Sequence, residues 1–210
     1  TYGASGARTA NVTGRNVSTG LVYAYGTNGG SGGTINLTST AGNVTMNNAT
    51  NATGNTNGNG GTINLTSTGG NVIANNTATV NSAGTGTAGS INVNTNGNSL
   101  NLNNGADLNA YGTTTGRGGN ISINSGSLAF NNGSHLQAYG GTEGGQVGVT
   151  TTGDMNLNGT NYIYAHSSNG GQGGTVNLTS TGGDVDISSG NARIYTYGPV
   201  SYTHLTLPTI

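Results

Sequence analysis

The chain has 210 residues, of which 42 are glycine, with no cysteine and only 4% charged residues that leave a net charge of −1. This near-neutral charge excludes the basic footprint of a nucleic-acid-binding protein, and the lack of cysteine excludes a disulfide framework or a thiolate metal site. No run of about 18 apolar residues is present, so we expect no segment that inserts into a membrane. The few apolar residues recur at regular intervals, which indicates a repeat architecture rather than a disordered chain.

The strongest internal repeat is the string Gly-Gly-Thr-Ile-Asn-Leu-Thr-Ser-Thr, which occurs unchanged at residues 32–40 and 60–68. Weaker copies start at Ala88, Gly118, Gly144 and Gly173. Successive copies begin 28, 28, 30, 26 and 29 residues apart. A period of this length is typical of solenoids, in which each unit buries its apolar face against its neighbours.

Three strand-like segments fall within each period. In the first, Ile63 and Leu65 alternate with polar residues, the period-two pattern of a half-buried strand. The second follows a Gly/Asn corner and has copies at 44–46, 72–74, 100–102, 128–130, 155–157 and 185–187. The third has copies at 22–26, 108–112, 136–140, 163–167 and 194–198. The sequence therefore predicts an all-β fold: a right-handed parallel β-helix (β-solenoid) with three strands per coil of about 28 residues and six to seven coils.

Stacking of coils about 4.8 Å apart turns each repeated position into a column along the axis. One apolar column is expected to wall the core: Ile35, Ile63, Ile91, Ile121, Val147 and Val176. An amide ladder is expected at one corner, because stacked side-chain amides can hydrogen-bond along the axis; its members are Asn47, Asn75, Asn103 and Asn131. A structural ladder of aromatic rings is expected from Tyr25, Tyr111, Tyr139 and Tyr197, with His166 in place of a tyrosine and Gly54 and Gly84 as gaps.

Residues 118–140 read Gly-Gly-Asn-Ile-Ser-Ile-Asn-Ser-Gly-Ser-Leu-Ala-Phe-Asn-Asn-Gly-Ser-His-Leu-Gln-Ala-Tyr-Gly. This string resembles the repeats of large filamentous-haemagglutinin-like exoproteins, and the resemblance covers about residues 10–198. It implies an adhesin segment that reaches the surface of a Gram-negative bacterium by two-partner secretion through an outer-membrane transporter. The implied partners are a host cell, a glycan or an abiotic surface. Autotransporter passengers carry similar motifs, so the secretion route stays open.

A carbohydrate-active β-helix enzyme is one alternative to adhesion. Such an enzyme gathers acidic groups on adjacent coils, and the chain offers Asp184 and Asp186 on one strand, with Asp154 one coil away. We interpret these as solvated acids, and we expect no catalytic residue, no cofactor and no metal site, so that the segment is not an enzyme. His135 and His166 are expected to be surface substitutions in the third strand that lack partners.

A second alternative is ice binding through a flat face of outward threonines. Pairs of threonines two residues apart lie beside a column of asparagines at Asn36, Asn64 and Asn177. Two coils break this pattern, with Asn94/Asn96 and Asn124/Gly126. Threonine is also simply common on exposed strands. The candidate outward-facing binding surface is formed by Thr38, Thr40, Thr66, Thr68, Thr150, Thr152, Thr179 and Thr181.

The composition changes at the C-terminal end of the sequence. Residues 200–209 read Val-Ser-Tyr-Thr-His-Leu-Thr-Leu-Pro-Thr, without glycine or asparagine. This resembles one translated frame of a common transposase-type sequencing adapter, and a codon for Pro199 fits the adapter bases that precede it. We therefore expect a β-helix domain over residues 1–198, an interior segment of a longer protein, followed by a non-native, adapter-derived tail over residues 199–210.

Overall fold

The computed structural model describes residues 2–3, 8–79, 86–103, 105–113, 115–131, 133–157, 159–188 and 190–198. Across these residues the chain forms strands and turns, without a helix. None of this part of the chain is therefore a long apolar helix of the kind that crosses a membrane. The expected tail, residues 199–210, lies outside the described residues.

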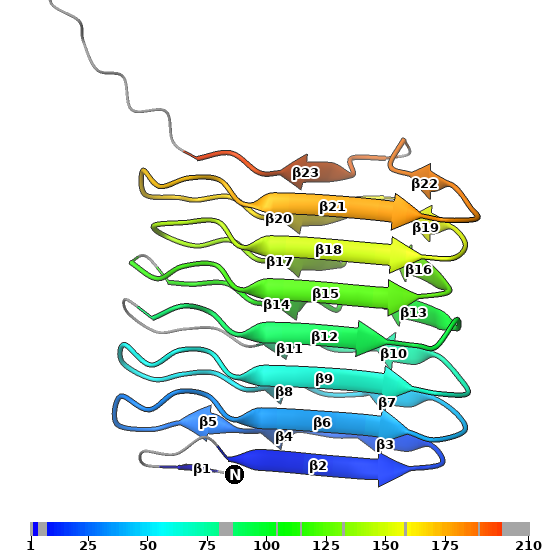
Figure 1. Ribbon diagram of the computed structural model, residues 1–210, viewed down its shortest axis with the longest axis horizontal. Coiled ribbons are helices and arrows are strands. Elements are labelled where there is room, and N and C mark those ends of the chain that lie inside the picture. The colour runs from blue at the N-terminus through cyan, green and yellow to red at the C-terminus, as the bar shows by residue number, and fades with distance from the viewer. Residues whose placement is uncertain are drawn as a thin grey trace, which may run out of the picture.

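Parallel strands stack into three seven-stranded sheets, one for each segment of the repeat (Figure 1). Sheet 1 contains β2 (Thr9–Gly14), β6 (Thr34–Ser39), β9 (Thr62–Ser67), β12 (Ser90–Asn94), β15 (Asn120–Ser125), β18 (Gln146–Thr151) and β21 (Thr175–Ser180). Sheet 2 contains β3 (Val17–Thr19), β7 (Val44–Met46), β10 (Val72–Ala74), β13 (Ser99–Leu102), β16 (Ser127–Phe130), β19 (Met155–Asn156) and β22 (Val185–Asp186). Sheet 3 contains β4 (Val22–Tyr23), β8 (Thr50–Asn51), β11 (Ala78–Thr79), β14 (Leu108–Asn109), β17 (His135–Gln137), β20 (Tyr162–Tyr164) and β23 (Arg193–Tyr195). A short pairing also joins β1 (Tyr2–Gly3) to β5 (Tyr25–Gly26).

The chain winds from sheet 1 through sheet 2 to sheet 3 before it rises to the next coil, and Figure 1 shows that this winding is right-handed. Equivalent residues stay in register from coil to coil, so that Ile63 pairs with Ile35 below it and with Ile91 above it. The predicted three-stranded parallel β-helix is confirmed. A first coil also begins at Thr9, which pairs with Thr34. Its strand, Thr-Ala-Asn-Val-Thr-Gly, is too divergent to stand out as a copy of the repeat.

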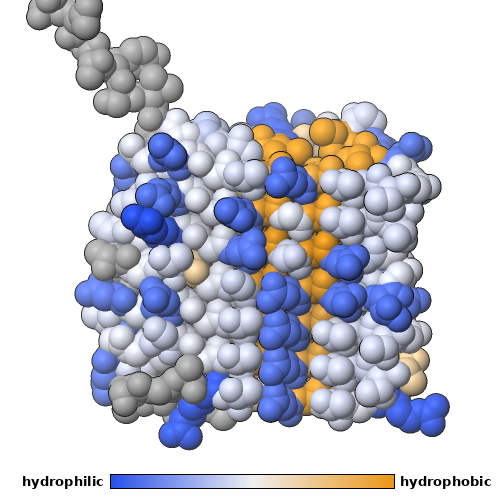
Figure 2. Space-filling view, in the orientation of Figure 1, coloured by the Kyte–Doolittle hydropathy of each residue, from blue (hydrophilic) through white to orange (hydrophobic). Residues whose placement is uncertain are grey.

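The core is a narrow apolar column, because side chains alternate between buried and outward positions along strands such as β6, β9 and β15. In β9, Ile63 and Leu65 are fully buried while the flanking polar residues face outward. Burial of each such side chain contributes roughly 1.5–3 kcal/mol. The predicted wall is buried from Ile35 to Val147, and Val176 in the last described coil is half-buried. In Figure 2 this apolar core shows through sheet 1 between columns of polar residues.

A column of buried hydroxyl groups closes the corner between sheets 1 and 2. Ser39 Oγ donates a hydrogen bond to the carbonyl oxygen of Arg15 at 2.6 Å and accepts one from the backbone nitrogen of Gly42 at 3.0 Å. One coil later, Ser67 Oγ bonds in the same way, at 2.6 Å to the carbonyl of Gly42 and at 3.1 Å to the nitrogen of Gly70. Small polar residues such as Ser39 and Ser67 are therefore compatible with the inside of this corner, since each finds both a donor and an acceptor on the backbone. Ser125 Oγ, in the same column, is buried without a hydrogen-bond partner among the described residues.

Glycines carry the chain from sheet 3 back into sheet 1. The backbone nitrogen of Gly61 donates to the carbonyl oxygen of Ala52 at 2.7 Å, and Gly33 makes the same bond to Ala24 at 2.7 Å. The coils approach so closely here that a Cβ atom on Gly61 would overlap the carbonyl oxygen of Gly33. Glycine is therefore required at this position for steric reasons.

Gly61→Ala is expected to destabilise the fold by about 3 kcal/mol, because the added methyl group collides with backbone that cannot move without breaking the coil-closing hydrogen bond. Gly148→Ala is the matched control, since a Cβ atom there meets no atom within 4 Å. We expect this control to raise stability by about 0.5–1 kcal/mol. Denaturant unfolding followed by circular dichroism measures both, and equal losses in the two variants would contradict the steric argument.

Candidate functional site

Aromatic rings stack along the outward side of sheet 3. Tyr111 stacks on Tyr139 with ring centroids 4.9 Å apart and planes 1° from parallel. The stack continues from Tyr139 to His166 at 5.1 Å and from His166 to Tyr197 at 5.0 Å. A coil spacing of about 4.8 Å places successive rings within the range of aromatic stacking. We call these four residues the Tyr139 column.

Tyr25 lies apart from this stack. Its ring contacts Tyr23, with centroids 5.0 Å apart, and its hydroxyl accepts a hydrogen bond from Asn51 Nδ2 at 3.0 Å. The register of β4 with β8 places Thr53 beside Tyr25 on the next coil, so the expected gap at Gly54 is wrong by one residue. Gly84, the other expected gap, lies outside the described residues.

Two shorter columns of rings lie beside the Tyr139 column. His135 stacks on Tyr162 at 5.1 Å. Tyr164 stacks on Tyr195 at 5.1 Å, and we call this pair the Tyr164 column. The Tyr164 ring stands edge-on to Tyr139, with centroids 6.4 Å apart and planes at 76°. The three columns therefore form one connected surface on the outside of sheet 3, which we call the aromatic face.

A partly buried carboxylate anchors one edge of the aromatic face. Asp107 Oδ1 accepts a hydrogen bond from the backbone nitrogen of His135 at 2.8 Å and lies 2.9 Å from His135 Nδ1. Its other oxygen, Oδ2, accepts a hydrogen bond from Gln137 Nε2 at 3.2 Å. Burial raises the pKa of Asp107, although attraction to His135 acts in the opposite direction. The expectation that His135 has no partner is wrong. The sequence signal for this contact is that Asp107 and His135 lie at the same position of successive repeats.

A hollow of about 500 Å³ opens in the aromatic face where the Tyr164 column begins. The register places Gln137 in the coil below Tyr164, so Tyr164 is stacked on one side only, against Tyr195. We call this hollow the Gln137 notch. It is lined by His135, Gln137, Tyr139, Tyr162, Tyr164 and His166. The repeat predicted the tyrosine column but not the notch, which arises because the three columns of rings begin in three different coils, at Tyr111, His135 and Tyr164.

The aromatic face carries little charge at neutral pH. Burial raises the pKa values of the Tyr139 and Tyr164 hydroxyls, which therefore stay protonated. Burial lowers the pKa of His166, whose Nδ1 atom is buried without a hydrogen-bond partner among the described residues. At the C-terminal end of the face, Arg193 follows Tyr162 in register and donates a long hydrogen bond of 3.4 Å to the hydroxyl of Tyr195.

Two asparagine ladders run along the solenoid axis. At the corner after sheet 2, Asn75 donates to Asn47 at 3.2 Å, Asn103 to Asn75 at 3.2 Å, and Asn131 to Asn103 at 2.9 Å. These are the four asparagines expected to form a ladder. A second ladder on sheet 1, in which the hydrogen bonds were not predicted, links Asn11, Asn36, Asn64 and Asn92 at distances of 2.7 to 2.8 Å. In Figure 2 it is the blue column over the apolar core.

The candidate threonines face outward on sheet 1 and at its edge. Thr38, Thr66, Thr150 and Thr179 lie in one register column, which Asn94 and Asn124 interrupt. The second column lies just past the strand ends, and its hydroxyls are engaged with the backbone of the preceding coil. The hydroxyls of Thr40, Thr68, Thr152 and Thr181 donate to the carbonyl oxygens of Gly14, Ser39, Gly126 and Thr151 at 3.3, 3.2, 3.5 and 3.3 Å.

Two of the acids considered for catalysis, Asp154 and Asp186, accept hydrogen bonds from nearby backbone groups. Asp154 Oδ1 accepts a hydrogen bond from the backbone nitrogen of Asp184 at 3.0 Å. Asp186 Oδ1 accepts one from the backbone nitrogen of Ser188 at 2.8 Å and one from its hydroxyl at 2.6 Å, and these bonds lower the pKa of Asp186. Among the residues that the structure describes, no three His, Cys, Asp or Glu side chains gather as metal ligands would.

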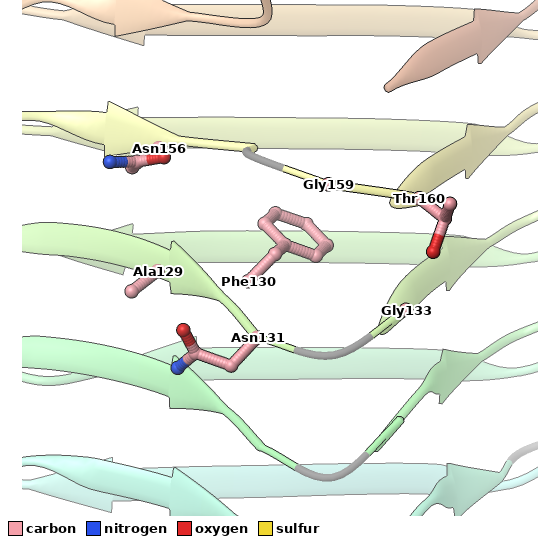
Figure 3. A pocket seen from close by; sticks show the side chains of 7 residues that line it. All are labelled: Ala129, Phe130, Asn131, Gly133, Asn156, Gly159 and Thr160. Carbon is pink, nitrogen blue, oxygen red and sulfur yellow. The ribbon is translucent and has the colours of Figure 1, made fainter. Parts of the chain in front are cut away.

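A second hollow, of about 520 Å³, opens at the corner between sheets 2 and 3 (Figure 3). The ring of Phe130 projects into the space between two successive coils there, and it is almost fully buried. The hollow is lined by Ala129, Phe130, Asn131, Gly133, Asn156, Gly159 and Thr160. These lining side chains include amides and a hydroxyl but no group that titrates near neutral pH, so they offer no acid–base pair.

His166→Tyr is expected to remove a pH dependence of stability. Because the folded chain holds the pKa of His166 below its usual value, the unfolded chain binds more protons, and stability falls as the pH drops from about 6.5 to the folded-state pKa. Tyrosine does not titrate in this range. Denaturation midpoints at about pH 7.5 and about pH 5 should therefore fall further for the unmodified chain than for the variant. Equal declines would contradict the burial of a neutral imidazole.

Completing the sheet 1 asparagine ladder is expected to stabilise the fold. Ser122 and Gly148 occupy the two positions between Asn92 and Asn177. Replacing both with asparagine adds amide hydrogen bonds that contribute about 0.5–1.5 kcal/mol each. The denaturation midpoint of this double variant is to be compared with that of Ser122→Ala/Gly148→Ala. An equal gain in both would mean that the amides add nothing beyond the loss of a strand glycine.

Comparison of the chain with known protein families, with curated proteins and with solved structures finds no match. The function has therefore to be inferred from the surfaces that the coils present. Of these, the aromatic face brings together the widest range of side-chain chemistry: stacked rings, a carboxylate–imidazole pair and an amide.

Proposed function

We propose that the chain is a structural and adhesive segment of a large secreted bacterial surface protein, of the filamentous-haemagglutinin-like kind. The observation that carries this proposal is the aromatic face. Tyrosine and histidine rings are stacked on the outside of sheet 3, where they do not contribute to the central core. Amphipathic rings of this sort are enriched where proteins attach to partners.

The solenoid architecture supports the same proposal. Each coil depends on its neighbours for burial, so the coils stack into a rod whose faces repeat along its length. Repeated weak contacts on one rod reinforce each other once the first has formed. The proposed partner is a host cell, a glycan or an abiotic surface, and the proposed route to the cell surface is export through an outer-membrane transporter.

The two rival functions have weaker support. An ice-binding face needs free, regularly spaced hydroxyls, whereas one of the two threonine columns donates its hydroxyls to the backbone and the other is interrupted by Asn94 and Asn124. A hydrolase needs paired carboxyl groups flanking a sugar. Asp184 and Asp186 line neither of the two hollows described above, the Gln137 notch and the corner at Phe130.

Attachment is tested with beads that carry the purified chain. We expect such beads to be retained on epithelial cells, on polysaccharide-coated slides or on glass several-fold more than beads carrying Gly61→Ala/Gly89→Ala. In this double variant both added Cβ atoms collide with backbone oxygens, and we expect the coils to unfold. Equal retention of the two bead types on all three surfaces would refute adhesion by the folded chain. Thermal hysteresis that is lost in Thr66→Tyr, or cleavage of a polysaccharide that is lost in Asp184→Asn, would replace this proposal with one of its rivals.

A further inference from the structure

We infer that the Gln137 notch is a binding subsite for a neutral oligosaccharide of β-linked pyranose rings, an inference that rests on the proposed adhesive function and names its ligand. The notch combines flat aromatic walls with an amide and an imidazole held in place by one carboxylate. Sites for small organic ligands are commonly built from aromatic side chains and a few fixed polar groups of this kind.

The first supporting feature is the unstacked side of Tyr164. One face of this ring packs on Tyr195, while the coil on the other side supplies Gln137 instead of a further ring. Tyr139 stands nearly perpendicular to Tyr164, so the two rings form adjoining walls at 76°. A pyranose ring with equatorial hydroxyl groups has a flat C–H face that packs on an aromatic ring. The notch offers such a sugar both a ring to lie on and a ring to lie against.

The second feature is the set of polar groups that the notch leaves available. Asp107 holds Gln137 through Nε2 and His135 through Nδ1. Within the described residues, Gln137 Oε1 and His135 Nε2 then have no hydrogen-bond partner. An amide oxygen and an imidazole nitrogen fixed in this way suit sugar hydroxyls, which both donate and accept. Because Asp107 fixes both side chains before the ligand arrives, little ordering is left for binding to impose.

The third feature is charge, which selects among saccharides. The residues that line the notch include no carboxylate, and the nearby carboxylate of Asp107 is paired with the imidazole of His135. Arg193 lies one coil beyond Tyr162, toward the C-terminal end of the aromatic face. One guanidinium does not make the basic groove that a sulfated or uronic-acid polymer needs. The small number of charged groups in and near the notch therefore favours a neutral sugar.

A tyrosine at position 137 is expected to block sugar binding without impairing folding. Gln137→Tyr puts a ring below Tyr164, continues the Tyr164 column by one coil and fills the notch. This variant should fold with a denaturation midpoint no lower than that of the unmodified chain, because the added ring gains a stacking partner. Tyr164→Ala removes the wall instead. Ser122→Tyr is the matched control, since it adds the same ring at an exposed position on sheet 1.

The experiment is calorimetric titration of the full chain with the hexasaccharide of β-1,4-linked glucose, alongside the hexasaccharide of galacturonic acid as the anionic counterpart. We expect saturable binding of the neutral sugar, weakened at least about tenfold in Gln137→Tyr and Tyr164→Ala and unchanged in Ser122→Tyr. We expect the anionic sugar to bind at least about tenfold more weakly.

Three results would overturn the inference: no saturable binding of the neutral sugar, equal affinity in Gln137→Tyr and the unmodified chain, or tighter binding of the anionic sugar. Each of these can occur while beads carrying the chain still adhere, in which case the adhesive function stands and the notch is not its sugar subsite. Sugar binding by a chain whose beads adhere to none of the three surfaces would instead support the subsite and remove the adhesive role.

Discussion

The spacing of parallel strands, about 4.8 Å, is the constraint on which the rest of this structure depends. Because the register holds from coil to coil, the nearest neighbours of a side chain along the axis are its counterparts in the coils above and below. A position tolerates only those residues that can contact a copy of themselves, or a suitable substitute, at that distance. Isoleucine satisfies this condition by packing, asparagine by its amide hydrogen bonds and tyrosine by ring stacking.

The same constraint explains a composition with only 4% charged residues. A column of like charges at this spacing repels itself, so a charge is tolerated best where the next coil supplies its opposite. Asp107 is followed by His135 at 2.9 Å, and Arg117 by Glu143 at 3.0 Å. Asp154 and Asp184 are neighbours of like charge, and both lie exposed to water, which screens their repulsion.

The fold could be predicted from the sequence because repetition encodes it more than once. Ile63 and Leu65 mark the inward side of one strand, and their counterparts 28 residues earlier mark the same side again. The first coil was weakly marked because Ala10 and Val12 are smaller than the residues that follow them in register. The Gln137 notch could not be predicted from any one column, since it exists only because the Tyr164 column begins one coil after the column that starts at His135 and two coils after the Tyr139 column, which starts at Tyr111. The contact between Asp107 and His135 could not be predicted from the repeat because it joins two unlike residues in successive coils, so no repeated column of residues marks it.

The Gln137 notch shows how a solenoid can gain or move a binding site without altering its fold. The hollow exists because one outward position of the repeat holds glutamine in one coil, Gln137, and tyrosine in the next two coils, Tyr164 and Tyr195. The same exchange in another coil would open an equivalent hollow one step along the rod, and it would leave the inward residues of both coils unchanged. The position of a site along such a fibre is thus set by outward residues alone, independently of the core. Outward residues of such a solenoid can therefore be exchanged while the rod beneath them stays the same.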